Sequence, residues 1–108
     1  MSTINRVNGI TGTAVAGAVT MTGRFGKVTT EALTTAAAAL YTLTITNTAI
    51  AATDMVMASC ANGTNSQGGP NVLSVTPAAG SLVIVIQNIH ASLALNGTLK
   101  ISYCSFAA

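Results

Sequence analysis

A chain of 108 residues is long enough to bury one two-layer core and too short for two domains. Half of its residues are hydrophobic and only 6% are charged, against about 25% in ordinary soluble domains, which excludes a disordered chain. Because a net charge of +2 gives separate copies little mutual repulsion, the composition predicts that much of the surface is buried between subunits.

The first part of the chain differs from the remainder. Residues 1–27 are rich in Gly, Thr, Ala and Asn and contain few large apolar side chains. No stretch reaches the roughly 18 uninterrupted apolar residues of a membrane-spanning helix, and residues 10–21 are broken by Thr and Gly. We interpret residues 1–27 as an extended N-terminal arm and first strand region, in preference to a secretory signal, with a turn at Thr22-Gly23. The main domain is then expected at residues 28–108.

After the arm, short segments rich in β-branched residues recur between turn signals, as in a sandwich or barrel. The predicted strands cover residues 28–33, 41–46, 55–61, 72–77, 81–88 and 98–106. Alternation predicts inward side chains at Tyr41, Leu43 and Ile45, and common faces for Leu73 with Val75 and for Leu99, Ile101 and Tyr103. The segments between them are predicted loops, of which residues 62–70, with three Gly and a Pro, are the clearest. The predicted fold is all-β: a Greek-key or jelly-roll sandwich of about seven to eight strands.

Two of these segments are apolar on both faces. They are SLVIVIQN (residues 81–88) and MVMASCA (residues 55–61). A strand with one wet face should alternate apolar and polar side chains. We therefore expect both strands at the centre of a sheet or against a neighbouring copy. The candidate residues for a subunit interface are Met55, Met57, Val83 and Val85.

Catalytic chemistry has little support. The chain has one histidine, His90, and two acids, Glu31 and Asp54. A Ser-His-Asp set can be assembled only on paper, because no nucleophile motif surrounds any serine. One histidine and two acids do not form a transition-metal site within one chain, although copies of His90 or Asp54 could meet at an ion on a threefold axis. We expect no enzyme, no cofactor and no resident metal, and we expect His90 to be a polar loop residue or a subunit contact.

Nucleic-acid binding is not expected either, because basic residues are few and no aromatic side chains are interleaved with them. Arg6, Arg24 and Lys27 lie in or beside the arm, where they could pair with acidic groups on a partner or simply solvate the chain. Cys60 and Cys104 have no metal-site spacing, so they are expected as small buried hydrophobes, with a disulfide between the sheets as the alternative. The Asn-Gly-Thr triplets that begin at residues 62 and 96 are expected to form turns.

Three segments of the chain resemble small virion proteins of tailed bacteriophages. They are VTTEALTTAAAALYTLTITNTAI (residues 28–50), ASCANGTNSQGGP (residues 58–70) and VTPAAGSLVIVIQNIHASLALNGTLKISY (residues 75–103). The resemblance covers roughly residues 28–106 and excludes the arm. It implies a β-sandwich that forms a homotrimer and decorates or cements the capsid by binding the major capsid protein, without nucleic-acid or membrane contact. Its location would be the capsid surface of the virion, after assembly in the bacterial cytoplasm. The alternative is a receptor- or glycan-binding module of a tail fibre or spike.

Overall fold

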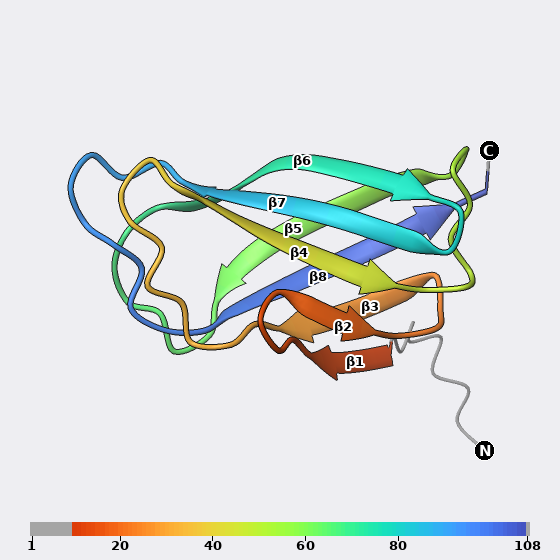
Figure 1. Cartoon of the computed structure of the whole chain (residues 1–108), viewed down its shortest axis with the longest axis horizontal. Coiled ribbons are helices and arrows are strands. Elements are labelled where there is room, and N and C mark those ends of the chain that lie inside the picture. The colour runs from red at the N-terminus through yellow and green to blue at the C-terminus, as the bar shows by residue number, and fades with distance from the viewer. Residues whose placement is uncertain (1–9, 108) are drawn as a thin grey trace, which may run out of the picture.

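The computed structural model describes residues 10–107 and contains eight strands in two four-stranded sheets (Figure 1). The strands are β1 (Ile10–Thr13), β2 (Ala18–Thr20), β3 (Phe25–Thr29), β4 (Leu40–Thr46), β5 (Met55–Asn62), β6 (Pro70–Ala78), β7 (Ser81–Asn88) and β8 (Leu99–Phe106). Sheet A has the order β1-β3-β8-β5 and sheet B the order β2-β4-β7-β6. The all-β prediction is therefore confirmed. The described part of the chain holds no helix long and apolar enough to cross a membrane.

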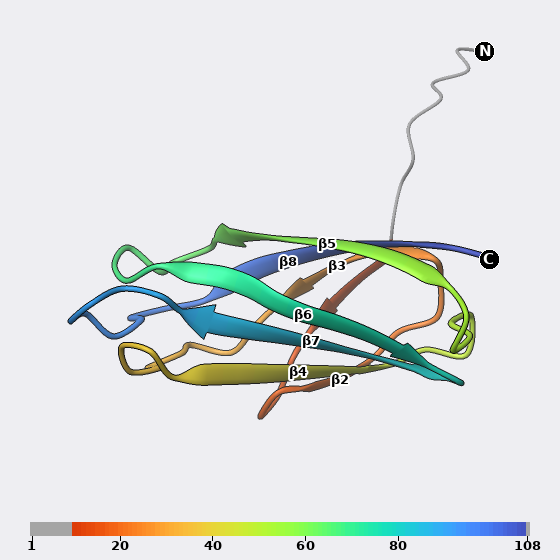
Figure 2. The same ribbon diagram turned by 90° about the horizontal axis from the view of Figure 1, so that it is seen from above.

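The two sheets lie face to face and bury the apolar side chains between them (Figure 2). Alternation along each strand decides which side chains enter this core. The inward positions predicted in β4 are confirmed for Leu43 and Ile45, and the common face predicted in β8 is confirmed for Leu99, Ile101 and Tyr103; all five side chains are buried. Tyr41 is half-buried against the same core.

Strand β7 lies inside sheet B, between β4 and β6. Leu82, Ile84 and Ile86 point into the core and are fully buried, whereas Val83 and Val85 point to the outer face and are half-buried. A two-residue turn joins β6 to β7, and its Gly80 has a φ of +81°, a conformation that side chains disfavour. The central position expected for this segment is thus confirmed, and the core covers one of its faces.

Strand β5 does not share that central position. It pairs with β8 on one side only and forms the edge of sheet A. Met55 and Met57 are 69% and 68% exposed, while Val56 points toward the core. The sheet-centre expectation is therefore wrong for this segment, because side-chain pattern reports which faces are apolar and carries no information about which edges are paired.

The common face predicted for Leu73 and Val75 is also wrong. The register of β6 against β7 shifts between Val72 and Ser74, which marks a β-bulge. A bulge inserts one extra residue and reverses the alternation beyond it. Val72 and Val75 consequently both pack against the core, and Leu73 is 52% exposed.

The N-terminal boundary expected between residues 27 and 28 falls inside β3. β1 pairs in parallel with β3, and β2 pairs in parallel with β4, so two segments of the expected arm, residues 10–13 and 18–20, belong to the two sheets. β3 begins at Phe25, whereas the corresponding strand is predicted at residues 28–33. A Cβ built on Gly26 would lie 2.6 Å from Cε1 of Tyr103, so this glycine permits the close approach of the aromatic ring. Residues 1–9 lie outside the described residues.

Buried asparagines hold the loops at both ends of the sandwich. Asn88 is fully buried: its Oδ1 accepts the N–H groups of Gly69 and His90, and its Nδ2 donates to the carbonyls of Thr35 and Leu93. One side chain therefore joins three loops.

At the other end of the sandwich, Asn47 is equally buried. Its Nδ2 donates to the carbonyl of Gly23 and to the hydroxyl of Tyr103. These amides provide the directional contacts that buried ion pairs provide in more highly charged proteins.

The two Asn-Gly-Thr triplets pack against each other. The N–H of Thr64 donates to Oγ1 of Thr98 at 2.9 Å, and the N–H of Thr98 donates to Oγ1 of Thr64 at 2.9 Å. The buried Asn65 accepts the N–H of Asn96 at 2.7 Å. Neither triplet forms the expected turn, because Asn62 still belongs to β5 and Gly63, Thr64 and Gly97 lie in bends; the reciprocal pairing instead joins the loops that follow β5 and precede β8.

Candidate interaction surfaces

The outer face of sheet A carries an apolar patch formed by three strands. In the sheet register, Cys104 stands between Phe25 and Met57, and Phe106 stands beside Met55. All five side chains project outward, because they occupy the positions that alternate with the buried residues of β3, β5 and β8. We call this set the methionine patch. Four of its members, all except Cys104, are among the exposed large hydrophobic residues.

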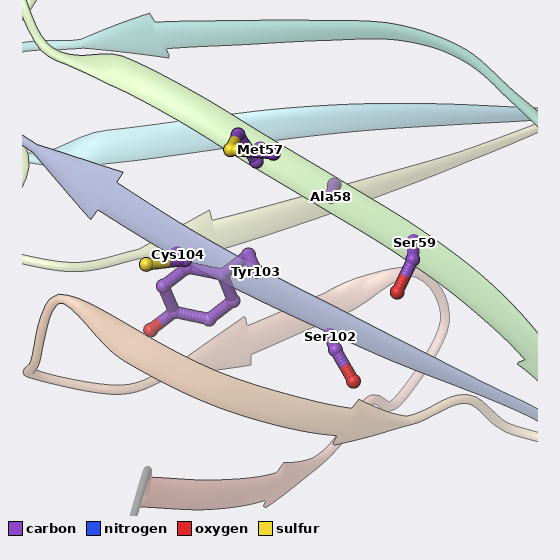
Figure 3. A pocket seen from close by; sticks show the side chains of 6 residues that line it. All are labelled: Met57, Ala58, Ser59, Ser102, Tyr103 and Cys104. Carbon is purple, nitrogen blue, oxygen red and sulfur yellow. The ribbon is translucent and has the colours of Figure 1, made fainter. Parts of the chain in front are cut away.

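A shallow hollow of about 260 Å³ lies within this face, between β5 and β8 (Figure 3). It is lined by Met57, Ala58, Ser59, Ser102, Tyr103 and Cys104. Met57 and Cys104 bound it at the patch, and the hydroxyl groups of Ser59 and Ser102 bound its other end. The hollow therefore offers a mainly apolar surface with two hydroxyl groups, and it contains no charged side chain.

Positive charge borders the methionine patch. Lys27 and Lys100 project from the same outer face, and both are exposed. Neither acid of the chain offsets them on that face. Glu31 accepts a hydrogen bond from the hydroxyl of Tyr41 at 2.8 Å, and burial, followed by this hydrogen bond, raises the pKa of Tyr41. The outer face of sheet A is consequently apolar at one end and basic beside it.

Asp54 is occupied within the chain. Its Oδ2 accepts the N–H of Ala51 at 3.0 Å, the hydroxyl of Ser105 at 2.9 Å, and Nη1 of Arg24 at 3.2 Å. These contacts, led by the backbone hydrogen bond from Ala51, lower the pKa of the carboxyl group despite the opposing effect of burial. The carboxylate is nearly buried, whereas the Arg24 side chain remains 41% exposed.

The outer face of sheet B has a different chemistry. Val83 lies between Thr44 and Thr76, and Val85 lies between Thr42 and Ser74. These strands present no charged side chain on this face. We call it the threonine face. It is wetted by hydroxyl groups and by the amides of Asn71 and Gln87, so a second uncharged surface could cover it without burying a charge.

The predicted interface residues therefore fall on two opposite surfaces. Met55 and Met57 belong to the methionine patch, and Val83 and Val85 belong to the threonine face. Of the predicted partner-contact residues, Lys27 lies on the outer face of sheet A, Arg24 is ion-paired with Asp54, and Arg6 lies outside the described residues. The structure does not bring the two methionines and the two valines together.

The residues considered for catalysis or metal binding are also separated. His90 follows the end of β7, whereas Asp54 lies near Ser105 at the opposite end of the sandwich. His90 and Asp54 therefore cannot form a Ser-His-Asp triad. His90 serves its own loop, because Nδ1 accepts the N–H groups of Ser92 and Leu93, both at 3.0 Å. Asp54 is too enclosed to meet copies of itself at an ion. Between residues 10 and 107, no group of three or more His, Cys, Asp or Glu residues could hold a metal ion.

The two cysteines are free and lie on opposite faces of sheet A. Cys60 points toward the core and is half-buried, and burial raises the pKa of its thiol. Cys104 points outward into the methionine patch and is also half-buried. The disulfide alternative is therefore wrong, and only Cys60 packs against the core as expected.

Sequence reasoning missed the contribution of Phe25, Cys104 and Phe106 to the patch. The available signal was alternation in the last strand, which already placed Cys104 and Phe106 opposite the core-facing residues. The predicted arm includes Phe25, whereas the structure pairs Phe25 with Cys104 in sheet A. Comparisons with protein-family models, curated proteins and solved structures found no match to this chain.

Proposed function

We propose that this protein is a structural component of a bacteriophage virion: a capsid cement or decoration protein that acts as a homotrimer on the major capsid protein. The observation that carries the proposal is the pair of opposite outer faces, one apolar with a basic border and one hydroxylated and uncharged. A protein that binds both other copies of itself and a capsid shell needs two separate contact surfaces of this kind. The resemblance to small phage virion proteins supports the same role.

The different side chains of the two outer faces suggest a different partner for each face. The methionine patch, with Lys27 and Lys100 beside it, suits a shell surface that offers apolar side chains and carboxylates. The threonine face, with Val83 and Val85, suits contact between copies. A trimer that touches several shell subunits at once holds them together even when each single contact is weak. The role is mechanical, and the proposal gives the protein no catalytic activity or cofactor.

The finer fold assignment belongs to the same proposal. β3 pairs with β8, β4 pairs with β7, and β5 lies beside β6, which is the nested order of a jelly roll. β1 and β2 then add one parallel strand to an edge of each sheet. A jelly roll decorating a shell would act on the capsid surface, after assembly in the bacterial cytoplasm.

The experiment that tests the role mixes purified protein with undecorated shells and follows heat-induced shell disruption. Wild-type protein should raise the disruption temperature. A variant with Phe25→Ser and Phe106→Ser should lose this effect and remain folded, because both side chains are exposed. Thr76→Ser on the threonine face is the matched control and should retain it. No gain in shell stability with wild-type protein would reject the role, and binding to glycans or host cells without shell binding would favour a receptor module.

A further inference from the structure

Each sheet ends in two edge strands, and three of these four edges carry a feature that discourages pairing with another chain. β1 and β2 have 4 and 3 residues, and β6 contains two prolines and a bulge. Short strands, prolines and bulges are the usual protections of sheet edges. β5 has none of them. It has eight residues, no charge, no proline and an unbroken register with β8.

The hydrogen-bond pattern shows which groups of β5 face outward. Thr30 donates its N–H to the carbonyl of Leu99 and Ser105 donates its N–H to the carbonyl of Arg24, so the odd-numbered residues of β8 bond to β3 and its even-numbered residues, which stand opposite the odd-numbered residues of β5, bond to β5. Hydrogen-bonded pairs recur at every second residue of an antiparallel ladder. The odd-numbered residues of β5 therefore bond to β8, and Val56, Ala58 and Cys60 turn their N–H and C=O groups to the free edge. Among the described residues, nothing bonds to these six groups.

From this free edge we infer that β5 pairs antiparallel with β5 of a second copy across a twofold axis, so that two A sheets join into one continuous sheet. The occupant is a second copy because β5 is complementary to itself. It is uncharged along its whole length, so self-pairing opposes no like charges. Its free donors and acceptors alternate at the spacing that an identical antiparallel strand presents.

The geometry also selects a register. A twofold axis normal to the sheet keeps outer side chains opposite outer side chains, and the new bonds must come from even-numbered residues. An axis through Ala58 meets both conditions and is the one that pairs all three residues with free groups, Val56, Ala58 and Cys60, among themselves. Val56 then pairs with the partner subunit's Cys60, and Ala58 pairs with the partner subunit's Ala58. On the outer face, Met57 lies opposite the partner subunit's Ser59, with Cβ atoms about 5 Å apart.

This contact does not rest on the shell binding proposed above, but it requires that the proposed trimers occur in pairs. Because it is isologous, it turns a monomer into a dimer, and it turns a trimer into a closed hexamer when its twofold axis meets the threefold axis at a right angle. It uses the edge of sheet A and leaves the threonine face free for a threefold contact. Failure of shell stabilisation would therefore leave this inference intact, and the reverse also holds.

The first test is Ala58→Pro in the full chain, with mass measured by light scattering. Proline at this position removes an edge N–H and leaves the bonds to β8 intact, a position where sheets accept proline. The expected result is a mass half that of wild type with an unchanged far-UV circular dichroism spectrum. A folded variant of unchanged mass, or a wild type with an odd number of copies, would overturn the inference.

A second pair of variants applies even if proline disturbs the fold. Met57→Lys with Ser59→Lys places lysines opposite each other at the proposed contact and should halve the mass at low salt. Met57→Lys with Ser59→Glu is the matched control and should retain the wild-type mass, because opposite charges then face each other. Equal masses for the two variants would refute the register. Deletion of residues 2–9 should leave the number of copies in the assembly unchanged. If the deletion halved that number, residues 2–9, and not the edge of β5, would hold the copies together.

Discussion

The bond network of Asn88 yields the sharpest prediction about stability. Asn88→Ala removes four hydrogen bonds of 2.8–3.1 Å that join three loops at one end of the sandwich. The residue is fully buried, so water cannot readily replace the lost partners. At about 0.5–1.5 kcal/mol of net stabilisation for each bond, the free energy of unfolding should fall by about 2–6 kcal/mol. Domains of this size are stable by only about 5–15 kcal/mol, so the loss is a large fraction of the total.

Urea unfolding followed by far-UV circular dichroism measures this change. With a urea dependence of about 2 kcal/mol per molar, the unfolding midpoint should fall by roughly 1–3 M at equal protein concentration. Gln87→Ala is the matched control on the adjacent residue, because its amide makes one exposed 3.3 Å bond to the carbonyl of Ala38. The control should change stability by no more than about 0.5 kcal/mol.

Asn88→Asp separates the donor from the acceptor role of the side chain. A carboxylate keeps the bonds from the N–H groups of Gly69 and His90 and places a second oxygen against the carbonyls of Thr35 and Leu93. It should destabilise at least as strongly as alanine above the ordinary aspartate pKa. A loss of under about 1 kcal/mol in both variants would refute the idea that one asparagine holds the three loops.

Three further predictions concern the core, pH and close packing. Ile84→Lys should unfold the domain because Ile84 is fully buried, whereas Val83→Lys should leave it folded and alter its association. Thermal melts would report the folding and light scattering the association. If both variants unfolded, the outer face would be part of the core. Because the pKa of Asp54 is lowered on folding, its contribution to stability is present above about pH 4 and is lost as the pH falls through the lowered value. In Asp54→Asn, the urea unfolding midpoint should vary less with pH between about pH 5 and pH 2.5 than it does in wild type. An equal dependence on pH in the two proteins would contradict this. Gly26→Ala should lower the melting temperature because its Cβ would meet the Tyr103 ring, and the added variant Tyr103→Leu should lessen the effect; no lowering would show that the ring moves aside freely.

The sequence alone was sufficient for the fold class and for much of the core. Residues 41–46 and 98–106 alternate cleanly, and the structure buries Leu43, Ile45 and Ile101 as that alternation requires. Alternation is a local property of a pleated strand, so it can be recognised without knowledge of the partner strands. Low charge also signalled outer faces with few ionic groups, although not their location.

Tertiary structure decided what depends on pairing between distant segments. The edge position of β5, the bulge at Leu73 and the composition of the methionine patch follow from which strands lie side by side. The buried asparagines depend on it as well, because Asn47 meets Tyr103 across 56 residues of sequence. Strand order and register are set by the whole set of contacts at once, and no local pattern encodes them.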